Sequence, residues 1–343
     1  MKQYFSVMLI LSAAVAVLPA VPVWFSGSAS SHEEEKTAVQ AASEPDAAPE
    51  EETVSPDEPY RVLDISTGNV IEVPVRDYVI GAVCAEMPAS FDSEALKAQA
   101  VAAHTYAERQ RRRERKAPDP ELKGADFSND TAVYQGFFTA EQARQCFGTG
   151  FDESYNKIAG AVDVVLPYII TYEDEPIISA FHSMSSGRTE SAENVWGAAV
   201  DYLVPVDSGY DRSAPKYREE VRYGRDVLRE KLTAAFPGIV LPENISEWIA
   251  VDEVSDSGTV LTASAGDKKV TGSELRSALG LRSACFEVRC EGEETVFTTR
   301  GFGHGVGMSQ YGAAAMAADG KSWKDILWHY YTGCEISEIK QDR

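Results

Sequence analysis

Residues 77–88 read DYVIGAVCAEMP, and residues 91–107 follow as FDSEALKAQAVAAHTYA. The first stretch is an apolar run that ends with one carboxylate, Glu86, directly before Met87 and Pro88. The second is rich in alanine and predicts a long helix. A carboxyl group among apolar neighbours loses hydration in its charged form, so its pKa rises and it can hold a proton near neutral pH. Glu86 is therefore a candidate general acid, although a solvated residue at a helix entry fits the same pattern.

The predicted helix has one apolar face. Positions on this face are separated by three or four residues and are all small or apolar: Leu96, Ala100, Ala103 and Ala107. Lys97 and His104 fall on a neighbouring stripe, where both can face the region of Glu86. Each also has a structural interpretation, Lys97 as a solvated surface charge and His104 as a hydrogen-bonded residue at the edge of the core.

Two further blocks carry polar side chains among small residues. Residues 181–190 read FHSMSSGRTE after a β-branched run, and residues 301–313 read GFGHGVGMSQYGA. Small hydroxyl residues and glycines after a buried strand make a loop that a ligand can approach closely. A polar surface turn is the alternative for the first block. The second block lacks the Lys-Ser/Thr ending of a phosphate-binding loop, so it is not a nucleotide loop.

These three blocks resemble the motifs of the SpoIID/LytB family, whose best-known member is a lytic transglycosylase acting on peptidoglycan. The resemblance covers residues 60–334 and implies that Glu86, in its Ala-Glu-Met-Pro tetrad, is the catalytic acid. The chain departs from the family at His104, where the family usually has Arg, and at Ser186, where it has Gly. Ala132 and Val133 replace a His-Cys pair that some relatives use in a metal site, so we expect no metal and no cofactor.

The resemblance also implies a cleft lined by both polar blocks. The residues that we expect to bind substrate are Lys97, His104, His182, Ser183, Ser185, Ser186, His304, Ser309, Gln310 and Tyr311. Tyr311 serves equally well as a packing residue. A glycoside hydrolase commonly needs two carboxylates, and the matched blocks offer one. A lytic transglycosylase can work with one, because the acid protonates the glycosidic oxygen and its carboxylate then takes a proton from the sugar's C6 hydroxyl.

The N-terminal part of the chain differs from the rest in composition. Residues 4–25 carry no charge, and as a helix they would span about 33 Å, close to a bilayer core of about 30 Å. Residues 1–25 are therefore predicted to be a transmembrane anchor with Lys2 on the cytoplasmic side, or alternatively a signal peptide cleaved near residues 26–30. Residues 26–58 are rich in Glu, Ala, Ser and Pro and predict a disordered acidic linker.

Residues 59–343 are expected to form a single α+β catalytic domain outside the membrane. The patterns predict strands at 62–65, 70–75, 161–172, 175–181, 249–251, 259–263, 285–290 and 295–300. They predict helices at 224–236, 271–281 and 310–318, the last of these capped by Ser309, and a final helix that is capped by Ser322 and ends before Gly333.

Charge and resemblance together restrict the partners. The net charge of −22 argues against nucleic-acid binding, which needs clustered Lys and Arg. The resemblance implies peptidoglycan strands stripped of stem peptides as the substrate, a setting in spore engulfment, and partners among membrane proteins and cell-wall enzymes such as an amidase. Two alternatives are a non-catalytic wall-binding enhancer of an amidase and a metal-dependent hydrolase that uses His182 and His304, which lack ligand-spaced companions.

Overall fold

Helix α3 (Ser93–Lys116) lies at the centre of the largest of three hydrophobic clusters in the described residues. The computed structural model describes residues 58–339. The predicted anchor at residues 1–25, and all but the last residue of the predicted linker at residues 26–58, therefore lie outside the described residues. Within residues 58–339, no helix is both long enough and apolar enough to cross a membrane.

The sequence explains where α3 begins and which face it buries. The Asp92 side chain caps the helix by accepting a hydrogen bond from the backbone N–H of Glu94 at 2.9 Å. The predicted apolar stripe is confirmed, because all of its residues are buried: Leu96, Ala100, Ala103 and Ala107. This face of the helix packs against α2 (Val75–Glu86), α5 (Phe151–Val165) and α9 (Gln310–Ala318).

The predicted N-terminal hairpin is present. Strands β1 (Tyr60–Asp64) and β2 (Asn69–Val73) pair antiparallel, and β3 (Phe127–Ser128) adds to β1 in parallel. The rings of Tyr60 and Tyr78 meet edge to face with centroids 5.1 Å apart, which attaches this sheet to α2.

A second hydrophobic core is built entirely from residues 218–300, which we call the second lobe; the other described residues are the first lobe. One sheet has the order β11-β12-β7 and the other β10-β9-β8. The strands are β7 (Arg218–Gly224), β8 (Ile249–Val254), β9 (Val260–Ala265), β10 (Lys268–Thr271), β11 (Phe286–Glu291) and β12 (Glu294–Arg300). Helices α7 (Arg225–Ala235) and α8 (Gly272–Leu279) complete the lobe, as the sequence predicts.

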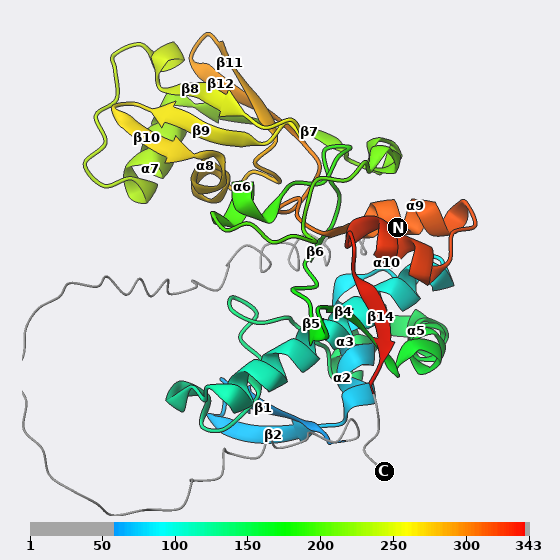
Figure 1. The fold of residues 1–343 in the computed structure, drawn as a ribbon. Coiled ribbons are helices and arrows are strands. Elements are labelled where there is room, and N and C mark those ends of the chain that lie inside the picture. Colours follow the sequence, from blue (N-terminus) through cyan, green and yellow to red (C-terminus); the bar gives the residue numbers. More distant parts are fainter. Residues whose placement is uncertain (1–57, 340–343) are drawn as a thin grey trace, which may run out of the picture.

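After the second lobe the chain returns to the first (Figure 1). Strand β13 (Met308–Ser309) pairs in parallel with β6 (Phe181–His182), and β14 (Glu335–Glu338) pairs with β4 (Tyr168–Tyr172). In the sequence, α9 and α10 (Trp323–Tyr330) lie between β13 and β14, and they are capped by Ser309 and Ser322 as the sequence predicts. The remaining elements are α4 (Ala140–Phe147), α6 (Ala192–Trp196), β5 (Glu175–Pro176) and the 3-10 helices η2 (Pro120–Leu122), η3 (Gly148–Gly150), η4 (Gly209–Ser213) and η5 (Ile245–Glu247).

The structure confirms the mixed α+β class but corrects two predicted strands. Residues 161–165 are the last part of helix α5, and only Tyr168–Tyr172 forms a strand. The buried residues of α5 include Ile158, Ala161, Val162 and Val165, a helical spacing that the β-branched composition concealed. The strand predicted at residues 175–181 shrinks to β5 and the first residue of β6, and the chain between them contains a tight turn in which the Ala180 N–H donates to the Ile178 carbonyl at 2.9 Å. The single catalytic domain over residues 59–343 stays a prediction.

Candidate active site

Glu86 is the last residue of α2, so its side chain lies where that helix ends. It keeps some accessible surface, although protein atoms surround its carboxyl group. Burial raises the pKa of Glu86 to about 7, and a hydrogen bond with the Gln310 side chain opposes this rise. A carboxyl group with this pKa is partly protonated at neutral pH and can act as a general acid.

Gln310, in the Gly-rich block at residues 301–313, brings this block into contact with Glu86. It is the first residue of α9 and is buried. Its amide Nε2 also lies 3.5 Å from Oε1 of Gln99 on α3. Gln99 is completely buried, and its own Nε2 has no hydrogen-bond partner among the described residues. Gln99 is not among the residues predicted from the sequence, although its position gives a signal: it is an amide three residues after Leu96 and four before Ala103, inside the apolar face.

The two polar blocks lie side by side, as the resemblance implies. The parallel pair of β6 and β13 places Ser309 opposite His182. Two further bridges join Met184 to Phe302 and Glu190 to Val306. Since Gln310 follows Ser309 directly, the pairing connects the His182 region to the Glu86 region.

His182 and His304 contact each other and are both neutral. Their ring centroids are 5.6 Å apart, and the Trp196 ring lies 5.8 Å from that of His304. Burial lowers the pKa of His182 to about 4 and that of His304 to about 3, and the charge of Arg276 lowers both.

Backbone contacts fix which nitrogen of each histidine carries the proton. His182 Nδ1 lies 3.1 Å from the Val306 carbonyl oxygen, so it donates, and its buried Nε2 is an acceptor with no partner among the described residues. His304 Nδ1 accepts from the Val306 N–H at 3.1 Å, and its other nitrogen donates to the Phe181 carbonyl. Because both nitrogens of His304 are engaged, this residue has no free lone pair for a metal ion.

Asp211, which the sequence analysis missed, connects the two blocks. Its carboxylate accepts hydrogen bonds from the backbone and hydroxyl of Ser185 at 2.8 and 2.6 Å, from the Ser309 hydroxyl at 2.7 Å and from the Ser208 hydroxyl at 3.0 Å. Ser185 and Ser309, both predicted to bind substrate, therefore direct their hydroxyls to a buried carboxylate. Nothing in the local sequence separates Asp211 from the exposed Asp207.

The remaining residues of the two blocks that were predicted to bind substrate, Ser183, Ser186 and Tyr311, each contact other parts of the protein. The Ser183 carbonyl accepts from the backbone N–H of Tyr311 at 3.0 Å, and the buried Ser183 hydroxyl has no partner within residues 58–339. The Ser186 hydroxyl donates to the Ser257 carbonyl of the second lobe at 2.6 Å. The Tyr311 ring packs edge to face on Phe91, 5.2 Å between centroids, and burial raises the pKa of Tyr311.

Lys97 and His104 have protein partners on α3 itself. Lys97 Nζ forms an ion pair with Glu94 at 2.6 Å, and the other oxygen of Glu94 accepts from the Trp323 N–H. His104 is buried with its Nε2 3.7 Å from a carboxylate oxygen of Glu108. Neither ring nitrogen of His104 has a hydrogen-bond partner in the described part of the chain.

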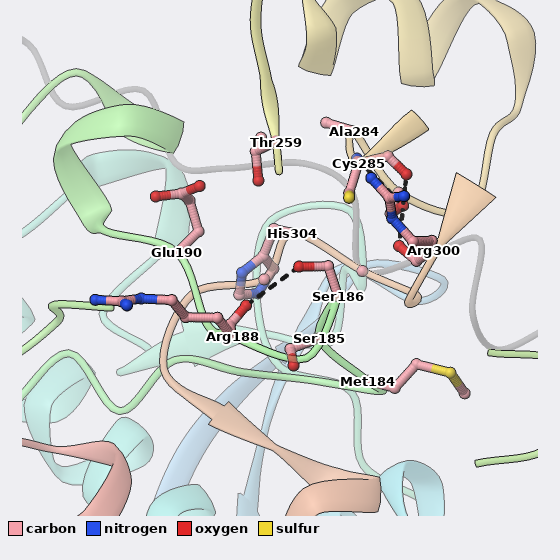
Figure 2. A pocket seen from close by; sticks show the side chains of 13 residues that line it. Met184, Ser185, Ser186, Arg188, Glu190, Thr259, Ala284, Cys285, Arg300 and His304 are labelled. Carbon is pink, nitrogen blue, oxygen red and sulfur yellow. Dashed lines mark hydrogen bonds between the residues drawn. The ribbon is translucent and has the colours of Figure 1, made fainter. Parts of the chain in front are cut away.

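A small cavity lies beside His304 where the two lobes meet (Figure 2). Its volume is about 20 Å³, room for roughly one water molecule. Glu190 lines it and accepts hydrogen bonds from the Ser255 hydroxyl at 2.5 Å and from the Asn194 amide at 2.9 Å. The cavity is too small for a sugar, and its contacts join the lobes. Residues 58–339 contain no group of three or more His, Cys, Asp or Glu that could hold a metal ion.

Comparisons with known proteins point in one direction. The family model described as SpoIID, stage II sporulation protein, matches residues 64–172. Stage II sporulation protein D of Bacillus subtilis (strain 168) is 36% identical over 342 residues, covering 98% of this chain and 96% of that protein. Its namesake in Bacillus amyloliquefaciens is 39% identical over 273 residues, covering 80% and 77%.

A more distant similarity is to an amidase enhancer. The amidase enhancer of Bacillus subtilis (strain 168) is 26% identical over 312 residues, which is 75% of this chain but 40% of that protein.

Proposed function

This chain belongs to the SpoIID family of stage II sporulation proteins, and on that premise we propose that it is a lytic transglycosylase that cleaves the glycan strands of peptidoglycan. The observation that carries the proposal is Glu86, a carboxyl group with a pKa of about 7, at the contact between α2 and the Gly-rich block. In the described part of the chain, burial and Gln310 are the two causes of its shifted pKa, and no second carboxylate contributes.

One carboxyl group can perform both proton transfers. Protonated Glu86 gives its proton to the glycosidic oxygen while the bond from that oxygen to C1 breaks and positive charge develops on the sugar ring. The resulting carboxylate then takes the proton of the C6 hydroxyl, whose oxygen bonds to C1 and closes a 1,6-anhydro ring. Glu86 ends as it began, and no water is consumed.

Gln310 suits this cycle because it can stabilise Glu86 in the charged form between the two steps. Two polar atoms of the candidate site that have no hydrogen-bond partner among the described residues suit the N-acetyl groups of the glycan, His182 Nε2 as an acceptor and Trp196 Nε1 as a donor. Ser183, Ser186, His304 and Tyr311 would shape the same surface.

The proposal includes a biological setting. The substrate would be strands stripped of their stem peptides, cut during spore engulfment together with other cell-wall enzymes. The chain would be held at the cell membrane by residues 1–25, with its catalytic part outside.

The test is digestion of peptide-free glycan strands by the full-length chain and by its Glu86→Gln variant, with products identified by mass spectrometry. Anhydro-ended sugars from the wild type alone support the proposal. Reducing-end products would indicate a hydrolase that activates water. Glu121→Gln, a change on the exposed η2, is the matched control and should cleave like wild type.

A second candidate rests on the similarity to the amidase enhancer. In this alternative the chain binds the wall and stimulates an amidase without cleaving glycans. It predicts that the Glu86→Gln variant stimulates amidase release of stem peptides as well as wild type does. Cleavage of peptide-free strands that depends on Glu86 would contradict a purely non-catalytic role.

A further inference from the structure

Arg276 on α8 is a partly buried cation that has no counter-ion among residues 58–339. Its Nε donates to the Arg282 carbonyl at 3.2 Å, and this is its one hydrogen bond to the described residues. No carboxylate of residues 58–339 lies within ion-pair distance of it. Arg282, by contrast, pairs with Glu219 at 2.8 Å. Burial lowers the pKa of Arg276, although an arginine stays charged in proteins.

Backbone hydrogen bonds place Arg276 beside the two polar blocks, residues 181–190 and 301–313. The Arg282 carbonyl that accepts from Arg276 also accepts from the N–H of Gly303 at 3.0 Å. Gly303 in turn lies against His182, since a Cβ on Gly303 would be 2.8 Å from the His182 Cβ. The second lobe thus presents this cation next to the two neutral histidines, and its charge lowers the pKa of both.

Unpartnered polar atoms nearby indicate a ligand. Two buried donors have no hydrogen-bond partner among the described residues, Ser183 Oγ and Trp196 Nε1, and both can donate to a carboxylate. Buried polar groups are normally satisfied, so exceptions gathered around one place call for an explanation. The cation is notable because the chain has 54 acidic residues against 32 basic ones, and yet none of those within residues 58–339 forms an ion pair with Arg276. An uncompensated, partly desolvated guanidinium favours an anion from outside the protein.

We propose that Arg276 binds the free lactyl carboxylate of an N-acetylmuramic acid residue and so selects strands whose stem peptide has been removed. This inference rests on the proposed glycan substrate. The sugar ring positions of such a strand are neutral, and its lactyl carboxylate is the anion that it offers. In an intact strand the same carbon is the carbonyl of a neutral amide, which does not compensate the guanidinium.

The test measures binding, so it does not depend on cleavage. The full-length Glu86→Gln chain is titrated calorimetrically with a tetrasaccharide of alternating N-acetylglucosamine and N-acetylmuramic acid that has free lactyl carboxylates, and with its methyl ester. The free acid should bind about 10-fold to 100-fold more tightly than the ester, the range of a charge-assisted hydrogen bond. Equal binding of acid and ester by this chain would overturn the proposal.

Variants locate the preference. Adding Arg276→Gln should make acid and ester bind equally, whereas Arg276→Lys, which keeps the charge, should retain part of the preference. Arg289→Gln, on the exposed β11 and paired with Glu220, is the matched control and should keep all of it. A preference that survives in a folded Arg276→Gln variant would also refute the proposal. A non-catalytic wall-binding protein would still prefer the free acid over the ester. Failure of the transglycosylase proposal would therefore leave this binding preference in place, and loss of the preference would refute the role of Arg276 alone.

Discussion

The side chain of Gln310 forms a hydrogen bond with that of Glu86, although one begins the helix after the Gly-rich block and the other ends the helix after the first hairpin. Burial and this contact act on the same carboxyl group in opposite directions, and both effects are measurable.

Cleavage should decline as pH rises through about 7, because the first step needs Glu86 protonated and burial raises its pKa to about 7. The measurement is the initial rate on peptide-free strands from pH 5 to 9. A rate that stays level between pH 6 and 9 would exclude Glu86 as the titrating acid.

Gln310→Met should raise the pKa of Glu86, since the lost hydrogen bond favoured the charged carboxylate. The descending limb of the pH profile should therefore move upward by about one pH unit. Gln145→Met, an exposed change on α4, serves as the control and should leave the profile in place. A downward shift in the Gln310 variant would contradict the assigned contact.

Asp211→Ala should destabilise the protein, because three serine hydroxyls would lose a buried acceptor: Ser185, Ser208 and Ser309. We expect a loss of about 3–5 kcal/mol, measured by urea unfolding, because each buried donor left unpaired costs about 1–3 kcal/mol. Asp207→Ala removes an exposed carboxylate four residues earlier and should cost under about 1 kcal/mol. Similar losses in the two variants would show that Asp211 is not the connection between the blocks.

Gly303→Ala should disturb His182, since the added Cβ would lie 2.8 Å from the His182 Cβ and the glycine has φ +110°. Gly320 also has a positive φ, +83°, but nothing lies within 4 Å of an added Cβ. Gly320→Ala should therefore cost only the backbone strain, about 1 kcal/mol, and keep full cleavage. Gly303→Ala should lose more stability, by urea unfolding, and cleave at least 10-fold more slowly. Equal behaviour of the two would mean that the contact with His182 is relaxed easily.

Stability should fall in acid because of His182 and His304. Burial lowers the pKa values of both histidines in the folded protein. Below about pH 6.5, the ordinary pKa of histidine, the unfolded chain therefore binds protons that the folded protein does not bind. The stabilisation is complete above pH 6.5 and declines by up to about 1.4 kcal/mol per pH unit for each histidine as pH falls. Unfolding of wild type and His182→Gln from pH 7 to 4.5 measures it, and the variant should show the shallower dependence.

Local signals in the sequence were enough for much of the fold. Ser309 and Ser322 were recognised as helix caps, and the apolar face of α3 was read from its spacing, because each depends on residues within one or two turns. The error at residues 161–165 arose because β-branched residues favour strands on average, whereas burial against α3 decides the helix.

The site was predicted only in part, for a physical reason. Glu86 stood out because its apolar neighbours precede it directly in the chain. Asp211, Gln99 and Arg276 acquire their roles from contacts between distant segments, which composition and spacing do not encode. The missing counter-ion of Arg276 is the clearest case, since it is a property of the folded surroundings and not of α8.

The chain leaves the first lobe after Tyr217 and re-enters at Gly301, whose N–H donates to the Tyr217 carbonyl at 2.9 Å. The two chain connections between the lobes thus lie side by side. Gln310, which contacts Glu86, follows the second lobe in the sequence. A ribosome must complete nearly the entire chain before Gln310 exists, so an unfinished or C-terminally shortened copy carries the acid without its partner. The contact between Glu86 and Gln310 therefore forms only in a nearly complete chain.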